Sequence, residues 1–150
     1  MQDILLRRAD RHDVGAIAQL SKELGYSVSL RDMSDRFARL MMRSDHAIFV
    51  VTESEDAVIG WIHICIAERL ESPAFAELGG LVVTEQRRGQ GIGSRLVAAA
   101  EHWAQQSGLG RLRIRSNVSR DDAHAFFRRL GYEHVKTQAI FQKQLQKGDQ

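Results

Sequence analysis

The fold of this chain is decided by the stretch Leu81-Val82-Val83-Thr84-Glu85-Gln86-Arg87-Arg88-Gly89-Gln90-Gly91-Ile92-Gly93-Ser94-Arg95-Leu96-Val97. An apolar strand is expected to end at Val83, a glycine-rich loop follows, and an amphipathic helix begins at about Ser94. Alternating glycines leave backbone N–H groups uncovered by side chains, and the start of a helix carries a partial positive charge. The stretch therefore predicts a pyrophosphate site.

Two familiar glycine motifs do not fit this loop. A dinucleotide fingerprint needs the spacing G-x-G-x-x-G, whereas Gly89, Gly91 and Gly93 give G-x-G-x-G. A P-loop closes on Lys followed by Ser or Thr, whereas Gly93 is followed by Ser94-Arg95. A structural turn, or a site for another phosphate ligand, stays as the alternative interpretation.

The bulk properties are those of one globular domain, expected to span 1–150 with a frayed tail at 146–150. The one cysteine, Cys65, excludes an intrachain disulfide and suits a reducing compartment. No segment resembles a signal peptide, and no apolar run approaches the ~20 residues of a membrane span. We therefore expect a cytoplasmic protein without a membrane partner.

The charge pattern does not favour a nucleic-acid partner. The formal net charge is +2, and basic residues are dispersed among acidic ones rather than gathered in a stripe. Arginine outnumbers lysine, which suits a polyanionic cofactor because arginine binds phosphate bidentately. Solvated helix faces explain the same bias equally well.

Hydrophobic periodicity predicts a mixed α/β (α+β) domain. The expected strands are 4–9, 47–53, 58–69, 74–83, 111–116 and 134–145, and the expected helices are 13–24, 30–42, 94–106 and 121–130. Gly25 and Gly131 are placed to end helices. Gly79-Gly80 interrupts the fourth strand, where glycines mark a bulge or a close backbone approach.

Alternation along the strand 58–69 separates two faces. Trp61, His63 and Cys65 point one way, and the isoleucines between and after them point the other way. His63 either faces a substrate cleft or is a packed strand residue. Cys65 is expected to be an inert thiol, with an acyl-enzyme nucleophile as the alternative.

Two segments carry a family resemblance. Arg88-Gly89-Gln90-Gly91-Ile92-Gly93 matches the R/Q-x-x-G-x-G/A motif of the Gcn5-related N-acetyltransferases (GNAT), and 116–133 resembles the second conserved region of that family. The second segment is most similar to the branch of bacterial enzymes that act on small molecules. The order of elements resembles the family over nearly the whole chain. The resemblance implies the GNAT fold: a mixed, mostly antiparallel sheet flanked by helices and splayed after a bulged fourth strand.

The resemblance also implies acetyl-coenzyme A (acetyl-CoA) as co-substrate, and no metal. Backbone groups of Leu81 and Val83 would pair with the pantetheine arm, and loop amides would bind the pyrophosphate. The residues implied at the cofactor are Leu81, Val83, Arg88, Gly89, Gln90, Gly91, Ile92, Gly93, Ser94, Asn117 and Phe127.

The candidate catalytic groups are Glu77 as general base and Tyr132 as acid. Glu77 precedes Arg88 by the spacing seen in the histone-modifying branch, and an ordinary edge-strand glutamate is its alternative. The family usually has Phe-Tyr where this chain has Phe126-Phe127, so the usual acid hydroxyl is absent. Tyr132 is the nearest phenol, although in this context it also suits packing. If the thiol of coenzyme A has a pKa near 8.5, like cysteine, its thiolate is an adequate leaving group without a general acid.

The function implied is transfer of the acetyl group to a primary amine, expected on a small molecule, by direct attack in a ternary complex. The alternatives are a protein N-terminal or lysine acetyltransferase and a non-catalytic acyl-CoA sensor. The acceptor is not readable from the sequence, and the acidic residues near its expected pocket are equally suited to solvent. A homodimer is expected from the family.

Overall fold

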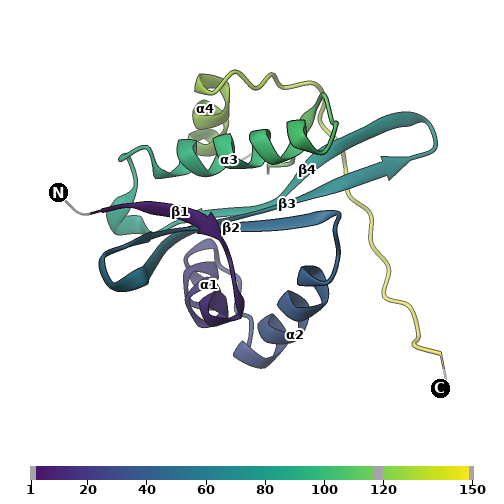
Figure 1. Cartoon of the computed structure of the whole chain (residues 1–150). Helices are drawn as coiled ribbons and strands as arrows, with labels where there is room; N and C mark the ends of the chain where they lie inside the picture. The colour runs from purple at the N-terminus through teal and green to yellow at the C-terminus, as the bar shows by residue number, and fades with distance from the viewer. Residues whose placement is uncertain (1–2, 117–119, 149–150) are drawn as a thin grey trace. The chain divides into compact units, whose positions relative to one another are not determined.

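The computed structural model describes residues 3–116 and 120–148 (Figure 1). The chain divides into two compact units, and the boundary in the sequence lies between Arg115 and Ser116. The first unit contains the sheet and the glycine-rich loop, and the second contains one helix and the C-terminal segment. That both form the single domain expected from the sequence stays a prediction.

The first unit is built on one five-stranded sheet. Neighbouring strands follow the chain order, β1 to β4 pair antiparallel, and β5 runs parallel to β4. The mixed, mostly antiparallel sheet predicted above is confirmed. The strands are β1 Leu5–Arg8, β2 His46–Glu53, β3 Ala57–Arg69, β4 Ser72–Val83 and β5 Leu112–Ile114.

Helices cover both faces of this sheet (Figure 1). On one face lie α1, Val14–Ser21, with its 3-10 extension Lys22–Leu24, and α2, Leu30–Met41. On the other face lies α3, Ile92–Gln106. Gly25, with φ of 88°, ends the first helical segment as predicted.

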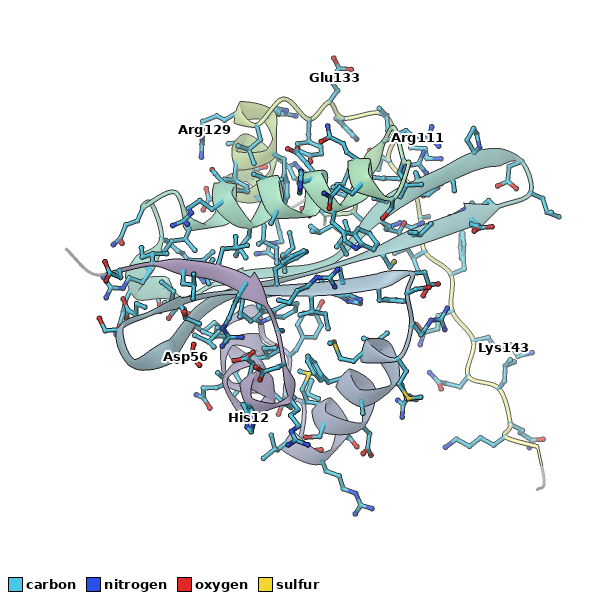
Figure 2. All side chains as sticks on the ribbon, viewed as in Figure 1. His12, Asp56, Arg111, Arg129, Glu133 and Lys143 are labelled. Carbon is cyan, nitrogen blue, oxygen red and sulfur yellow. The ribbon has the colours of Figure 1, made fainter. Side chains whose placement is uncertain are left out.

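The alternation in β3 sorts its side chains between the two faces, as the sequence predicted. Ile62 and Ile64 are fully buried. Burying such a side chain contributes about 1.5–3 kcal/mol. Trp61, His63 and Cys65 are only partly buried, and Trp61 packs at the edge of the core under α1 and α2. Side chains fill the space on both sides of the sheet (Figure 2).

A bulge interrupts β4 where Gly79-Gly80 predicted one. His63 pairs with Gly80 and Ile64 pairs with Leu78, so Gly79 is the extra residue. β5 pairs with β4 only from Ala76 to Leu78. In the described part of the chain, β4 therefore continues beyond the bulge with an open edge, which is the splay that the resemblance implied.

The second unit contains α4, Asp121–Arg129, followed by Gly131 with φ of 95°. The expected strand at 134–145 is wrong for this structure, because the described residues after α4 have no regular secondary structure. A strand needs a hydrogen-bonded neighbour, and this segment has none among the described residues. Its large apolar side chains are exposed instead: Val135, Ile140, Phe141 and Leu145.

Candidate active site

The glycine-rich loop connects β4 to α3 through a short 3-10 turn, Glu85–Arg87. Gly89 and Gly91 both have φ of 80°, and a Cβ at either position would meet nothing within 4 Å. Glycine is thus required here by the backbone conformation rather than by lack of space. Gly91 is the N-cap of α3, which begins at Ile92, slightly before the predicted start at Ser94.

The first turn of α3 is left open for a ligand. The first N–H groups of a helix have no intrahelical acceptor, and Gly91 provides no side chain to cap them. Gly89, Gln90 and Gly91 are exposed, so the backbone of the loop is accessible. This arrangement of uncapped amides at a helix N-terminus suits an anion such as a pyrophosphate.

A residue that the sequence did not indicate holds the loop in place. The carboxylate of Glu23, from the 3-10 turn after α1, accepts 2.8 Å and 3.2 Å hydrogen bonds from the Glu85 N–H and the Thr84 hydroxyl. Thr84 N–H in turn donates to Ile59 O at 2.9 Å. No local motif reports such a contact, because its partners lie more than sixty residues apart in the chain.

The predicted loop residues divide between backbone and side-chain roles. Arg88 folds its guanidinium back, and its Nε donates to Val83 O at 3.2 Å. The Ile92 side chain is buried in the core, so only its backbone can face a ligand. Leu81 and Val83 are partly exposed along the open stretch of β4.

The bulge in β4 lies directly under two rings from β3. A Cβ at Gly79 would stand 2.7 Å from His63 Nδ1, and one at Gly80 would stand 2.7 Å from Trp61 Cη2. Both distances are too short for a carbon contact, so these positions require glycine. The structure thereby brings His63 to the bulge, and whether it faces a substrate stays a prediction.

His63 is hydrogen-bonded to a second histidine that the sequence did not single out. His46 Nδ1 and His63 Nε2 are 2.8 Å apart, and the two rings stack with centroids 5.1 Å apart. Burial, together with the neighbouring His46, lowers the pKa of His63 to about 4. His63 is therefore a neutral imidazole at physiological pH.

The groups next to His46, on the far side of this pair from the bulge, are charged. His46 Nε2 lies 3.9 Å from Asp45 Oδ1, and Asp45 accepts two hydrogen bonds from Arg43, at 2.9 and 3.0 Å. Hydrogen bonding to Arg43 lowers the pKa of Asp45 to about 2. Cys65 lies on the same strand as His63, and burial raises the pKa of its thiol. Because the thiolate is the reactive form, this supports the inert-thiol interpretation over the acyl-enzyme one.

Glu77 lies on the same sheet face, opposite Cys65 in the β3–β4 register. Its Oε2 is buried and, within the described residues, has no hydrogen-bond partner, although Arg115 Nε lies 3.3 Å away. Trp61 Nε1 is likewise buried without an acceptor among those residues. An unsatisfied donor and an unsatisfied acceptor on one face are the groups that a polar ligand would engage.

Of the remaining predicted residues, Phe127 and Tyr132 belong to the second unit, Asn117 is not described, and Gly93 and Ser94 lie in α3. The rings of Phe127 and Tyr132 meet edge to face with centroids 6.2 Å apart, and Tyr132 N–H donates to Phe127 O at 3.0 Å. Asn117 lies outside the described residues. Ser94 and Gly93 occupy the first turn of α3 and are partly exposed.

Comparison with known proteins decides the family. The model of the acetyltransferase (GNAT) family matches residues 14–132. The chain belongs to the GNAT family. The loop, the bulge and the splay described above are thus those of a GNAT acetyltransferase, and the fold predicted from the motif is confirmed.

Curated relatives of this GNAT protein act on small molecules. It is 33% identical over 131 residues to an aminoalkylphosphonate N-acetyltransferase of Salmonella typhimurium, covering 85% of this chain and 84% of the relative. It is 26% identical over 145 residues to an aminoglycoside N(6')-acetyltransferase type 1 of Stenotrophomonas maltophilia, covering 94% of both.

A solved structure shares the fold of this GNAT protein. Aminoglycoside N-acetyltransferase AAC(6')-Iy, solved with CoA, superposes with a TM-score of 0.86 over 97% of each chain, at 16% identity. That likeness concerns the fold alone.

In 3–116 and 120–148, no three His, Cys, Asp or Glu side chains are grouped to hold a metal ion. Within the same ranges, no helix is long and apolar enough to cross a membrane.

Proposed function

We propose that this GNAT protein transfers the acetyl group of acetyl-CoA to a primary amine of a small molecule, by direct attack in a ternary complex. The observation that carries the proposal is the uncapped N-terminus of α3 behind the Gly89 and Gly91 turns, next to the open edge of β4. A pyrophosphate on the helix and an extended pantetheine arm along the strand would each find backbone partners there.

The proposed cofactor contacts are those that the family resemblance supplied. Amides of the loop and of the first turn of α3 take the pyrophosphate, and backbone groups of Leu81 and Val83 take the arm. A strand N–H near the bulge would polarise the thioester carbonyl, and one fixed donor to a developing oxyanion is worth about 3 kcal/mol. Asn117 and Phe127 remain proposed contacts on the basis of the motif.

Glu77 is the proposed contact of the acceptor amine. Its buried Oε2 makes no hydrogen bond among the described residues, and its ion-pair partner Arg115 Nε stands 3.3 Å away. An amine N–H donating to this oxygen would supply the missing hydrogen bond. The family spacing also offers Glu77 as the general base, and in that role Glu77→Gln would lower turnover and remove the rise in rate with pH.

The leaving thiolate would be protonated without the usual tyrosine. Phe127 occupies the sequence position of that tyrosine, and Tyr132 is proposed as the alternative acid. Phe127→Tyr tests whether an acid is missing, because a large gain in turnover would show that the native site lacks one. Tyr132→Phe tests the substitute directly: if Tyr132 is the acid, turnover falls at unchanged cofactor affinity.

The acceptor class is proposed from the relatives together with the site. Both curated relatives named above are N-acetyltransferases for small amines, so a small-molecule amine is the leading acceptor. We propose a cytoplasmic enzyme with neither a nucleic-acid nor a membrane partner. A homodimer is also proposed, on the family resemblance alone, and light scattering tests it.

Release of free thiol from acetyl-CoA tests the function with a panel of amines: aminoglycosides, aminoalkylphosphonates, polyamines, amino acids and short peptides. Turnover with a small amine supports the proposal. Turnover confined to peptides would support a protein acetyltransferase instead. Cofactor binding without turnover on any amine would support the acyl-CoA sensor.

A further inference from the structure

We propose that His63, in place of Glu77 as base and of Tyr132 as acid, accepts the proton of the attacking amine and later returns it to the leaving thiolate, while His46 takes up the Nε2 proton of His63 in between. The inference rests on the proposed acetyl transfer. It begins from the position of His63, whose Nδ1 would stand 2.7 Å from a Cβ on Gly79. The imidazole thus lies over the bulge, at the point where β4 loses its pairing with β5.

The neighbours of the two histidines indicate which nitrogen of His63 carries a proton. Asp45 Oδ1, 3.9 Å from His46 Nε2, favours the hydrogen of His46 on that nitrogen. His46 Nδ1 is then the acceptor in the 2.8 Å contact, so His63 donates from Nε2. This leaves the lone pair of His63 on Nδ1, the ring atom nearest to a Cβ on Gly79.

The surroundings explain why two histidines are present. The inner ring is buried and resists a positive charge, as its low pKa shows. The outer ring places its Nε2 3.9 Å from Asp45 Oδ1, a carboxylate that is itself paired with Arg43. Other charged or titratable groups on this side, among the described residues, include Arg43, paired with Asp45, Cys65 and Glu77 on the same sheet face, and Arg115, paired with Glu77. The core side chains that α1 and α2 bring to this face are apolar.

The proton balance closes within one turnover. The amine N–H breaks as Nδ1–H forms on His63, while His63 Nε2–H passes to His46 Nδ1 and makes His46 an imidazolium. When the C–S bond breaks, His63 Nδ1–H is given to the thiolate sulfur, and His46 returns its proton to His63 Nε2. Both starting tautomers are restored, and the products are the amide and the free thiol. The pair thereby supplies the acid that Phe127 lacks.

Kinetics separate this role from a structural one. His63→Gln should lower kcat about 100-fold, the scale of a lost general base, while the Kd for CoA by calorimetry stays unchanged. The amide oxygen of Gln in His46→Gln can still accept from His63 Nε2 but cannot hold the charge. This variant should lose about 10-fold in kcat and recover rate with added imidazole. His102→Gln, on α3 across the sheet, is the matched control and should leave kcat unchanged.

Nitrogen NMR of the histidine rings tests the tautomers without turnover and without a variant. At neutral pH the wild-type protein should show His63 and His46 each protonated on Nε2 alone. A proton on His63 Nδ1 would overturn the proposal. So would a His63→Gln variant that keeps kcat within about twofold of wild type, or one less affected than Glu77→Gln. If no amine is acetylated, the proposed function fails, whereas a transferring wild type with an unaffected His63→Gln refutes this inference alone.

Discussion

Glu23 accepts a 2.8 Å hydrogen bond from the backbone N–H of Glu85, and so joins the turn after α1 to the loop that precedes α3. We expect Glu23→Ala to raise the Kd for CoA about 5- to 10-fold, because the loop loses two hydrogen bonds worth about 1 kcal/mol each. Glu23→Gln keeps an acceptor oxygen and should show a smaller effect. Calorimetry with CoA measures both, and equal affinity in wild type and Glu23→Ala would refute the anchoring role.

The turns before α3 give a second prediction with a close internal control. Gly91→Ala forces a side chain into the left-handed region, at a cost of about 1–2 kcal/mol, and should weaken CoA binding roughly tenfold. Gly108 follows the other end of α3, has the same φ of 80° and has equally open space around it. Gly108→Ala should therefore cost similar stability but leave the Kd for CoA unchanged. Equal loss of affinity in both variants would mean that the loop has no special role.

The bulge is expected to tolerate no side chain. Gly79→Ala places a methyl group against the His63 ring, and the clash should lower the free energy of unfolding by about 1–3 kcal/mol and abolish acetyl transfer. Gly15→Ala is the control, because Gly15 is an exposed helical position with nothing within 4 Å of the added carbon. That change should stabilise the protein by about 0.5–1 kcal/mol. Urea unfolding compares the two, and a neutral Gly79→Ala would contradict the packing described above.

Acid stability should depend on Asp13, which is 3% exposed. It accepts 2.7 and 2.8 Å hydrogen bonds from Arg7 and another of 2.8 Å from the Asp10 N–H. Arg7 also pairs with Asp56, in the turn between β2 and β3 (Figure 2). Burial raises the pKa of Asp13, but these hydrogen bonds outweigh it, and the net shift is downward.

The sign of the pH effect follows from that lowered pKa. Folding favours the ionised carboxylate, so its stabilisation is complete above the unfolded pKa of about 3.9 and is lost as pH falls through the lower folded value. Asp13→Asn should cost about 2–3 kcal/mol at pH 7, and the gap to wild type should narrow in acid. Urea unfolding from pH 7 to pH 3 measures this, with exposed Asp35→Asn as the control. A gap that is constant with pH would contradict the assignment.

The fold was largely predictable because its signals are local. Alternation in β3, the helix stop at Gly25 and the Gly79-Gly80 interruption each act within a few residues. The final strand was missed because a strand forms only against a neighbour, and apolar alternation in 134–145 does not say which neighbour is present. The GNAT motif likewise located the glycine-rich loop. The helix start predicted at Ser94 was too late in the chain, because α3 begins at Ile92.

The candidate site was less predictable because its contacts are distant in sequence. His46 and His63 meet across two strands, and Glu23 reaches the loop from another layer of the fold. Neither the composition nor the spacing of residues in the sequence indicates such contacts. Glu77 was identified through the family spacing, but its contact with Arg115 from the end of β5 was visible only in the structure.

The central claim is acetyl transfer from acetyl-CoA to a small amine at the β4–α3 site. The most direct measurement is mass spectrometry of reactions that contain acetyl-CoA labelled with carbon-13 in the acetyl group and one small amine, with wild type and Gly91→Ala side by side. The account predicts a labelled amide and free thiol in equal amounts with wild type, and much less of both with the variant. Labelled acetyl-CoA recovered intact from every amine, although the protein binds it, would contradict the account.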